Sequence, residues 1–174
     1  MQALKGKHIY LRALEPEDIQ FLFTTENDTS FWEVSSTQTP FSKFILEQYI
    51  ANSHQDIYTA KQLRLVIAKN TSDKAIGMID LFDFSSQHQR AGIGILITNE
   101  NQQKGFASEA LSILIDYCFK TLNLHQLFAN ISSDNKISLE LFKKFNFKEV
   151  GVKKEWIYID STYKDEILFQ LIKQ

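Results

Sequence analysis

The sequence predicts an α+β fold, in which one mixed β-sheet carries helices on both faces. Three apolar runs between residues 63 and 98 are separated by turn residues, as in an antiparallel meander. The next stretch, 101–122, spaces its apolar residues three and four apart, as a helix with one buried face does. The apolar run 127–133 follows that helix, so a right-handed crossover should place it parallel to the strand at 90–98.

Length and composition define the class of protein. The 174 residues suit a single domain, 1–174, and 44% of them are apolar. A net charge of −2 gives no general reason to expect nucleic acid or a membrane surface as a partner. The one cysteine, Cys118, excludes an internal disulfide framework, and the four histidines have no metal-ligand spacing, so no metal is expected. We expect a cytoplasmic protein, and a homodimer is left open.

The N-terminal part contains a strand and two helices. The alternating residues 8–14 predict a strand, and Pro16 with nearby acids predicts a helix start. The polar stretch 27–40 is expected to be a loop or a broken helix. Ser42 is a suitable N-cap for a helix over 43–52, with four residues facing inward: Phe44, Ile45, Tyr49 and Ile50.

The remaining elements follow the meander strands 63–69, 75–84 and 90–98. After the strand at 127–133, Asp134 or Asn135 should cap a helix that runs to about residue 145. Three final strands are expected at 147–151, 156–159 and 166–172.

The loop before the central helix has the properties of an anion site. The first turn of a helix has backbone N–H groups without intrahelical partners, and the helix dipole adds partial positive charge there. Gly105 lets the backbone approach an anion closely, and Lys104 adds a cation. Such a helix end binds phosphate.

Two motifs make this interpretation specific. Gln102-x-x-Gly105-x-Ala107 resembles the Q/R-x-x-G-x-G/A pyrophosphate loop of the GNAT superfamily of acyl-CoA-dependent N-acetyltransferases, and neither GxGxxG nor GxxxxGK[ST] is present. Further along, 134–151 resembles the GNAT segment N-x-x-S-x-x-L-Y-x-K-x-G-F. The matching residues are Asn135, Ser138, Leu141, Lys144 and Phe147.

The resemblance implies a GNAT fold: a twisted, mostly antiparallel sheet of six to seven strands with a central parallel pair that splays apart. The spermidine and ribosomal-protein N-terminal acetyltransferase branches look nearest. It also implies acetyl-CoA as cofactor. The implied cofactor-binding residues are Ile95, Leu96, Ile97, Gln102, Gln103, Lys104, Gly105, Phe106, Ala107, Ser108, Asn135 and Ser138.

The sequence departs from the family pattern at two positions. The tyrosine regarded as general acid for the leaving thiolate falls at Phe142, which has no proton to give. The glutamate often found on the central strand falls at Gly92. Asp80, Asp83 and Glu33 are the candidates for a weak replacement base or for binding a cationic amine, although each is also consistent with a solvated surface charge.

The weak base affects the expected acceptor. A lysine-like amine, with a pKa of about 10.4, is neutral less than about once in a thousand molecules at pH 7, whereas an α-amine, with a pKa of about 8, is neutral roughly once in ten. We therefore expect an N-acetyltransferase that acts on a primary amine, with a preference for a peptide or protein N-terminal α-amine. The alternatives are a polyamine acetyltransferase of the spermidine type and an acyl-CoA-binding module with little catalysis.

Trp32 and Glu33 are candidates for lining the acceptor site. The opposing interpretation is that Phe31 and Trp32 fill the core beneath a loop.

Overall fold

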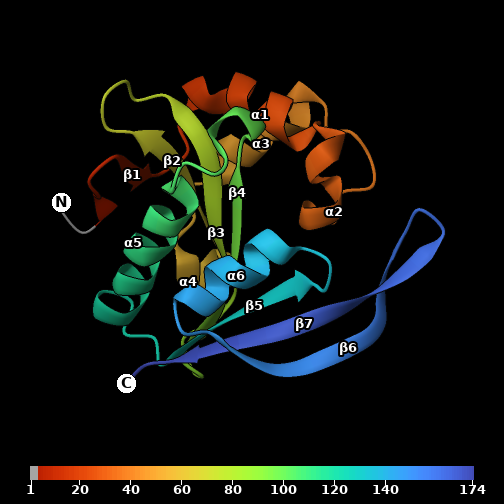
Figure 1. Cartoon of the computed structure of the whole chain (residues 1–174). Coiled ribbons are helices and arrows are strands. Elements are labelled where there is room, and N and C mark those ends of the chain that lie inside the picture. The colour runs from red at the N-terminus through yellow and green to blue at the C-terminus, as the bar shows by residue number, and fades with distance from the viewer. Residues whose placement is uncertain (1–3) are drawn as a thin grey trace.

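A single seven-stranded sheet runs through the structure, a computed structural model that describes residues 4–174 (Figure 1). Among residues 4–174 the strand order is β1-β2-β3-β4-β5-β7-β6, and only the β4–β5 pair is parallel. The predicted α+β fold, the meander and the parallel crossover are confirmed. The strands are β1 (Ile9–Arg12), β2 (Leu63–Lys69), β3 (Ala75–Ser85), β4 (Arg90–Ile97), β5 (Gln126–Ser132), β6 (Lys148–Ile159) and β7 (Thr162–Ile172).

Helices cover both faces of the sheet because neighbouring strand residues point to opposite sides. On β3, Ile79 belongs to the larger core cluster, which includes residues of α5 and α6. Met78 belongs to a second cluster, with residues of α1 and α3. The helices are α1 (Ile19–Glu26), α2 (Trp32–Ser35), α3 (Lys43–Asn52), α4 (Ile57–Ala60), α5 (Phe106–Lys120) and α6 (Lys136–Lys144).

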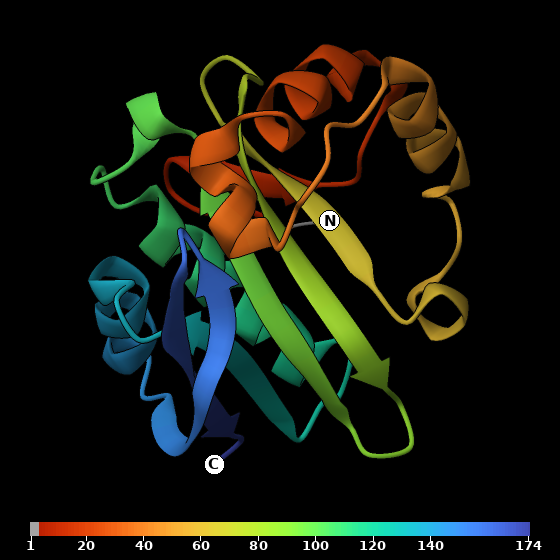
Figure 2. The same cartoon turned by 90° about the vertical axis from the view of Figure 1, so that its right-hand side faces the viewer.

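The parallel pair separates part-way along its length. β4 and β5 pair only from Arg90↔Gln126 to Gly92↔Phe128. Beyond this point β4 remains paired with β3 as far as Ile97, while β5 remains paired with β7 as far as Ser132. The two strands therefore splay, and one backbone edge of β4 is left without a strand partner. The helices α5 and α6 begin near this opening (Figures 1 and 2).

The inward face predicted for α3 is partly wrong. Phe44 and Ile45 are 64% and 49% exposed, whereas Leu46 and Ile50 are buried. Leu46, Tyr49 and Ile50 form the i, i+3, i+4 stripe that meets the sheet, and the two preceding residues fall outside it. The predicted N-cap is confirmed, because the Ser42 hydroxyl accepts a hydrogen bond from Ile45 N at 3.2 Å.

Two other elements differ from expectation. The strands predicted at 147–151 and 156–159 are one long strand, β6, whose pairing register shifts between Lys153 and Ile157. The short helix α4 was not predicted, although Asp56 caps it by accepting hydrogen bonds from Tyr58 N and Thr59 N at 2.8 and 2.9 Å. Both elements are too short or too irregular to produce a clear hydrophobic period.

Candidate active site

The start of α5 has the backbone geometry of an anion site. Gly105 is its N-cap, with a φ of +82° in the left-handed region that favours glycine, and its missing Cβ would meet no atom within 4 Å. The first intrahelical hydrogen bond runs from Glu109 N to Gly105 O at 3.1 Å. The amides of Phe106, Ala107 and Ser108 therefore precede the helical ladder and are available to a ligand.

A groove of about 550 Å³ extends from this helix end along the free edge of β4 to α6. We call it the coenzyme groove. All of the predicted cofactor-binding residues except Lys104 line it. Lys104 is turned away, and its ammonium donates to Glu100 O at 2.6 Å.

Several polar side chains of the groove hold its walls in place. The Gln102 amide donates to Ile97 O at 3.0 Å, which fixes the loop against the end of β4. Asn135 is the cap of α6, and its side chain accepts from Ser138 N at 3.2 Å. Lys144 of α6 donates to the Ser108 hydroxyl at 2.8 Å and so connects the two helices that border the groove.

A second cavity, of about 710 Å³, meets the coenzyme groove where β4 and β5 separate. We call it the acceptor cavity. Three acids line it, namely Glu33 of α2, Asp134 after β5 and Glu166 of β7. The residues that line both spaces are Ser30, Val34, Ile95, Asn135 and Ser138.

Each acid of the acceptor cavity is paired with a lysine. The Lys164 ammonium is 2.7 Å from Glu33 Oε1 and 2.7 Å from Asp134 Oδ2, and Lys153 pairs with Glu166. Hydrogen bonds from Lys164 and Ser132 lower the pKa of Asp134, and the same contact with Asp134 raises the pKa of Lys164. The β6–β7 hairpin that carries both lysines reaches up beside α2 (Figure 2).

Trp32 lies outside both spaces. Its indole Nε1–H donates to Glu26 O at 3.0 Å, and the residue lines neither the coenzyme groove nor the acceptor cavity. Phe31, by contrast, is 8% exposed and lines the coenzyme groove. Of the pair predicted for the acceptor site, only Glu33 lies on the cavity wall.

Neither of the two aspartates predicted as weak bases lines the acceptor cavity, although Asp80 lies in an adjoining pocket that shares lining residues such as Phe82 with it. Asp80 accepts two hydrogen bonds from Arg64, at 2.9 and 2.8 Å, and Arg64 also pairs with Glu26. Burial by itself lowers the pKa of Arg64, but the charges of Asp80 and Glu26 outweigh burial and raise it. Asp83 is exposed, with a φ of +47°, at the irregular end of β3. Neither carboxylate lines the acceptor cavity.

Aromatic rings surround both Phe142 and Gly92, the two positions at which the sequence was expected to depart from the family pattern. Phe142 is 2% exposed, lines the acceptor cavity and meets Phe147 edge-on at 5.0 Å between ring centroids. A Cβ atom on Gly92 would lie 2.4 Å from ring carbons of Phe82, so a glutamate at that strand position would require the Phe82 ring to shift.

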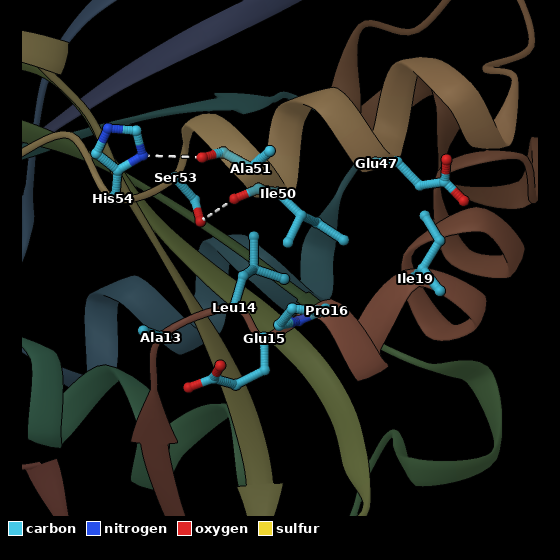
Figure 3. Close-up of a pocket in the computed structure, with 10 residues that line it drawn as sticks. All are labelled: Ala13, Leu14, Glu15, Pro16, Ile19, Glu47, Ile50, Ala51, Ser53 and His54. Carbon is cyan, nitrogen blue, oxygen red and sulfur yellow. Dashed lines mark hydrogen bonds between the residues drawn. The ribbon is translucent and has the colours of Figure 1, made fainter.

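A further cavity, of about 590 Å³, lies between the loop 13–16 and the ends of α1 and α3 (Figure 3). Two of its polar side chains form hydrogen bonds with the backbone of α3. His54 Nδ1 is 2.8 Å from Ala51 O, and the Ser53 hydroxyl donates to Ile50 O at 2.6 Å. It shares no residue with the coenzyme groove or the acceptor cavity.

Residues 4–174 contain neither a helix suited to crossing a membrane nor a cluster suited to holding a metal. That part of the chain has no helix long and apolar enough to cross a membrane. Over the same residues, His, Cys, Asp and Glu form no group of three or more that could hold a metal ion. Cys118 is fully buried, and burial raises the pKa of its thiol to about 12, so it is not a nucleophile.

The sequence did not indicate that Asp134 and Glu166 line this cavity, or that Lys164 pairs with two of its acids. The signal for Asp134 was its position just after the carboxyl end of β5, where ligand sites of α/β sheets occur. Lys164 and Glu166 lie two residues apart on β7 and belong to no motif. Only the pairing of the strands shows which face of the sheet they occupy.

Comparison with known proteins agrees with this geometry. Residues 8–148 match the family described as the acetyltransferase (GNAT) domain. The spermidine N(1)-acetyltransferase of Vibrio cholerae is 29% identical over 92% of this chain and 90% of its own length. The uncharacterized N-acetyltransferase YoaA of Bacillus subtilis is 27% identical over 98% of this chain and 96% of its own.

A solved structure shows the same fold. The V. cholerae spermidine N-acetyltransferase in complex with CoA and spermine superimposes with a TM-score of 0.86, at 26% identity, over 94% of this chain and 95% of that one. The family match covers most of the sequence and includes every residue that lines the coenzyme groove. The chain therefore belongs to the GNAT acetyltransferase family and is an acetyl-CoA-dependent N-acetyltransferase.

Proposed function

We propose that the protein acetylates a primary amine of a polyamine of the spermidine type, bound in the acceptor cavity. The observation that carries this proposal is a cavity with three carboxylates on its wall that opens directly into the coenzyme groove. Carboxylates at a cavity wall attract polycations and orient their ammonium groups. The relatives named for spermidine acetylation support a polyamine rather than the peptide N-terminus that the sequence suggested.

The coenzyme groove provides the contacts that coenzyme A requires. The amides of Phe106 to Ser108 would hold the pyrophosphate, because a helix start without a side-chain cap favours anions. The free edge of β4 at Ile95 to Ile97 would hydrogen-bond the extended pantetheine arm as a neighbouring strand would. Bound acetyl-CoA supplies the activated acetyl group as a thioester.

The reaction needs little chemistry from side chains. The acceptor nitrogen bonds to the acetyl carbon, the carbon–sulfur bond breaks, and the nitrogen loses a proton. A main-chain N–H of β4 beyond Gly92 would stabilise the developing oxyanion. Phe142 offers no proton to sulfur, but a thiol has a pKa of about 8.5, so it can leave as thiolate near neutral pH.

Deprotonation of the acceptor would depend largely on solvent. The three acids that line the cavity are each bound to a lysine, and Asp80 is bound to Arg64. A carboxylate held by a cation is a weak base. The fraction of acceptor amine that is already neutral should therefore limit the rate.

Release of free thiol from acetyl-CoA tests this proposal with a panel of amines. The panel contains spermidine, spermine, lysine, and peptides that begin with Ala or Ser. Release with the polyamines and little with peptides supports the proposal. Release with peptides alone would show that the acceptor is an α-amine.

A second candidate function is coenzyme A binding with little catalysis. The observation that favours it is the pair of aromatic positions, with Phe142 in place of an acid and Phe82 over Gly92 in place of a base. Thermal shift by coenzyme A without thiol release from any amine would support this function over acetyl transfer.

A further inference from the structure

We infer that Lys164 sets the charge selectivity of the acceptor cavity, because its ammonium competes with those of the acceptor for Glu33 and Asp134. The inference rests on the proposed polyamine acceptor. It assigns a role in specificity to Lys164, a residue that belongs to neither motif of the coenzyme groove.

The contacts place this ammonium between the two acids. Lys164 Nζ is 2.7 Å from an oxygen of each carboxylate, and the Lys164 side chain is 24% exposed. Asp134 is held from its other side, since the Ser132 hydroxyl donates to its Oδ1 at 2.7 Å. Glu33 and Asp134 line the cavity, as does Ile157, which lies opposite Lys164 in the β6–β7 ladder. A protein cation thus occupies a position that suits a substrate cation.

The lysine partners reduce the negative charge of the wall. Three lining carboxylates and their two paired ammonium groups sum to −1, whereas the carboxylates alone sum to −3. Hydrogen bonds to Asp134 and Glu33 raise the pKa of Lys164, so it keeps its charge throughout the pH range of an acetylation assay. A polycation must therefore displace or share Lys164 to reach Glu33 and Asp134.

Replacement of Lys164 should strengthen polycation binding selectively. In Lys164→Gln, spermidine is expected to bind about fivefold more tightly by calorimetry, the upper range for a partly exposed ion pair. Propylamine, which carries one charge, should bind with little change. The gain for spermidine should shrink as salt is raised, because screening weakens interactions between exposed charges.

Lys154→Gln is the matched control. Lys154 lies on the same hairpin and pairs with Asp165 at 2.8 Å, but neither residue lines the cavity. This variant loses the same charge and should bind spermidine as the wild type does. Equal tightening in both variants would overturn the inference, because the effect would then come from net charge alone.

A double variant tests the opposite change, a loss of spermidine affinity. In Glu33→Gln with Asp134→Asn, Lys164 loses both partners and faces the acceptor, so spermidine should bind more weakly than to the wild type. Weaker or unchanged spermidine binding in Lys164→Gln, with an unchanged melting temperature, would overturn the inference.

Calorimetry also separates this inference from the proposed function. Tighter spermidine binding in Lys164→Gln without any acetylated spermidine would leave the role of Lys164 intact and reject the polyamine as acceptor. Acetylation of spermidine, together with equal spermidine affinities in Lys164→Gln and wild type, would support the polyamine as acceptor and reject the role of Lys164.

Discussion

The ring of Phe82 occupies the space that a side chain at Gly92 would need. The two residues are directly paired between β3 and β4, and a Cβ on Gly92 would lie 2.4 Å from two carbons of that ring. The ring is also held edge-on by Phe128, at 5.5 Å between centroids. A side chain at position 92 would therefore have to displace the Phe82 ring, which forms part of the wall of the acceptor cavity.

Gly92→Glu should destabilise the protein by about 1–3 kcal/mol, because overpacking forces the Phe82 ring from its position. Phe82→Ala combined with Gly92→Glu should be less destabilised than the sum of the two single changes, because the smaller residue makes room. Chemical denaturation of all three variants measures this coupling. Strictly additive losses would contradict the steric explanation.

Phe142→Tyr should increase turnover, because it places a proton donor at the position of the family's tyrosine. A general acid typically contributes about 10²- to 10⁴-fold, and a rise of about the lower value is expected. Steady-state kcat with spermidine measures the effect. Phe145→Tyr is the control, since Phe145 ends α6 and does not line the acceptor cavity. An unchanged kcat in both variants would show that proton delivery to sulfur does not limit the reaction.

The residues that line the coenzyme groove could be predicted from the sequence because those at its helix end are close together in the chain. The residues from Gln102 to Ser108 form one loop and one helix start, so their spacing alone specifies the geometry. The splayed edge of β4 followed from the resemblance, which implied a strand pair that separates.

The acceptor cavity could not be predicted in this way. Glu33 and Lys164 are 131 residues apart, and their contact depends on how the β6–β7 hairpin curves towards α2. Asp80 and Asp83 of β3 are each flanked by apolar residues, but Asp80 is bound by Arg64 in an adjoining pocket and Asp83 lies in a left-handed backbone turn, so neither lines the acceptor cavity. Such placements depend on tertiary partners, which a single sequence does not reveal.

Gly105→Glu should abolish coenzyme A binding. Residue 105 needs a left-handed backbone, and a carboxylate there would repel the pyrophosphate. Gly151→Glu is the control, because a side chain at that position also meets nothing within 4 Å but lies on β6, away from the groove. A thermal shift titration with coenzyme A compares them. Equal affinity in Gly105→Glu and wild type would show that the loop does not bind the cofactor.

Stability should depend on pH through Asp18, which is 6% exposed and accepts from Arg12 at 2.7 and 2.8 Å. Burial raises the pKa of Asp18, but hydrogen bonds from Arg12 and Glu15 N outweigh burial and lower it. Because the pKa of Asp18 is lower in the folded than in the unfolded protein, the ionised carboxylate stabilises the fold at pH values above the unfolded pKa of about 3.9. That stabilisation is lost as the pH falls through the folded pKa.

Asp18→Asn should therefore lower the free energy of unfolding by about 1–3 kcal/mol at pH 7. This difference in stability from the wild type should shrink below about pH 4. Urea denaturation across this pH range measures it. Asp116→Asn is the control, because Asp116 is 63% exposed and pairs only with Lys120 in the part of the chain described. A difference that does not vary with pH would contradict the assignment to the Arg12 pair.

The rate of acetylation should rise steeply with pH, because no free carboxylate faces the acceptor cavity among residues 4–174. With an acceptor amine of pKa about 10.4, kcat/KM should increase roughly tenfold per pH unit from 7 to 9. Initial rates with spermidine measure this slope. A plateau near pH 7 would reveal a general base.

Mass spectrometry of spermidine after incubation with the protein and acetyl-CoA tests the central claim most directly. We expect monoacetylated spermidine, formed by the wild type and not by Gly105→Glu. If spermidine stays unmodified, even at pH 9, while coenzyme A still stabilises the protein against heat, the acceptor cavity does not serve polyamine acetylation.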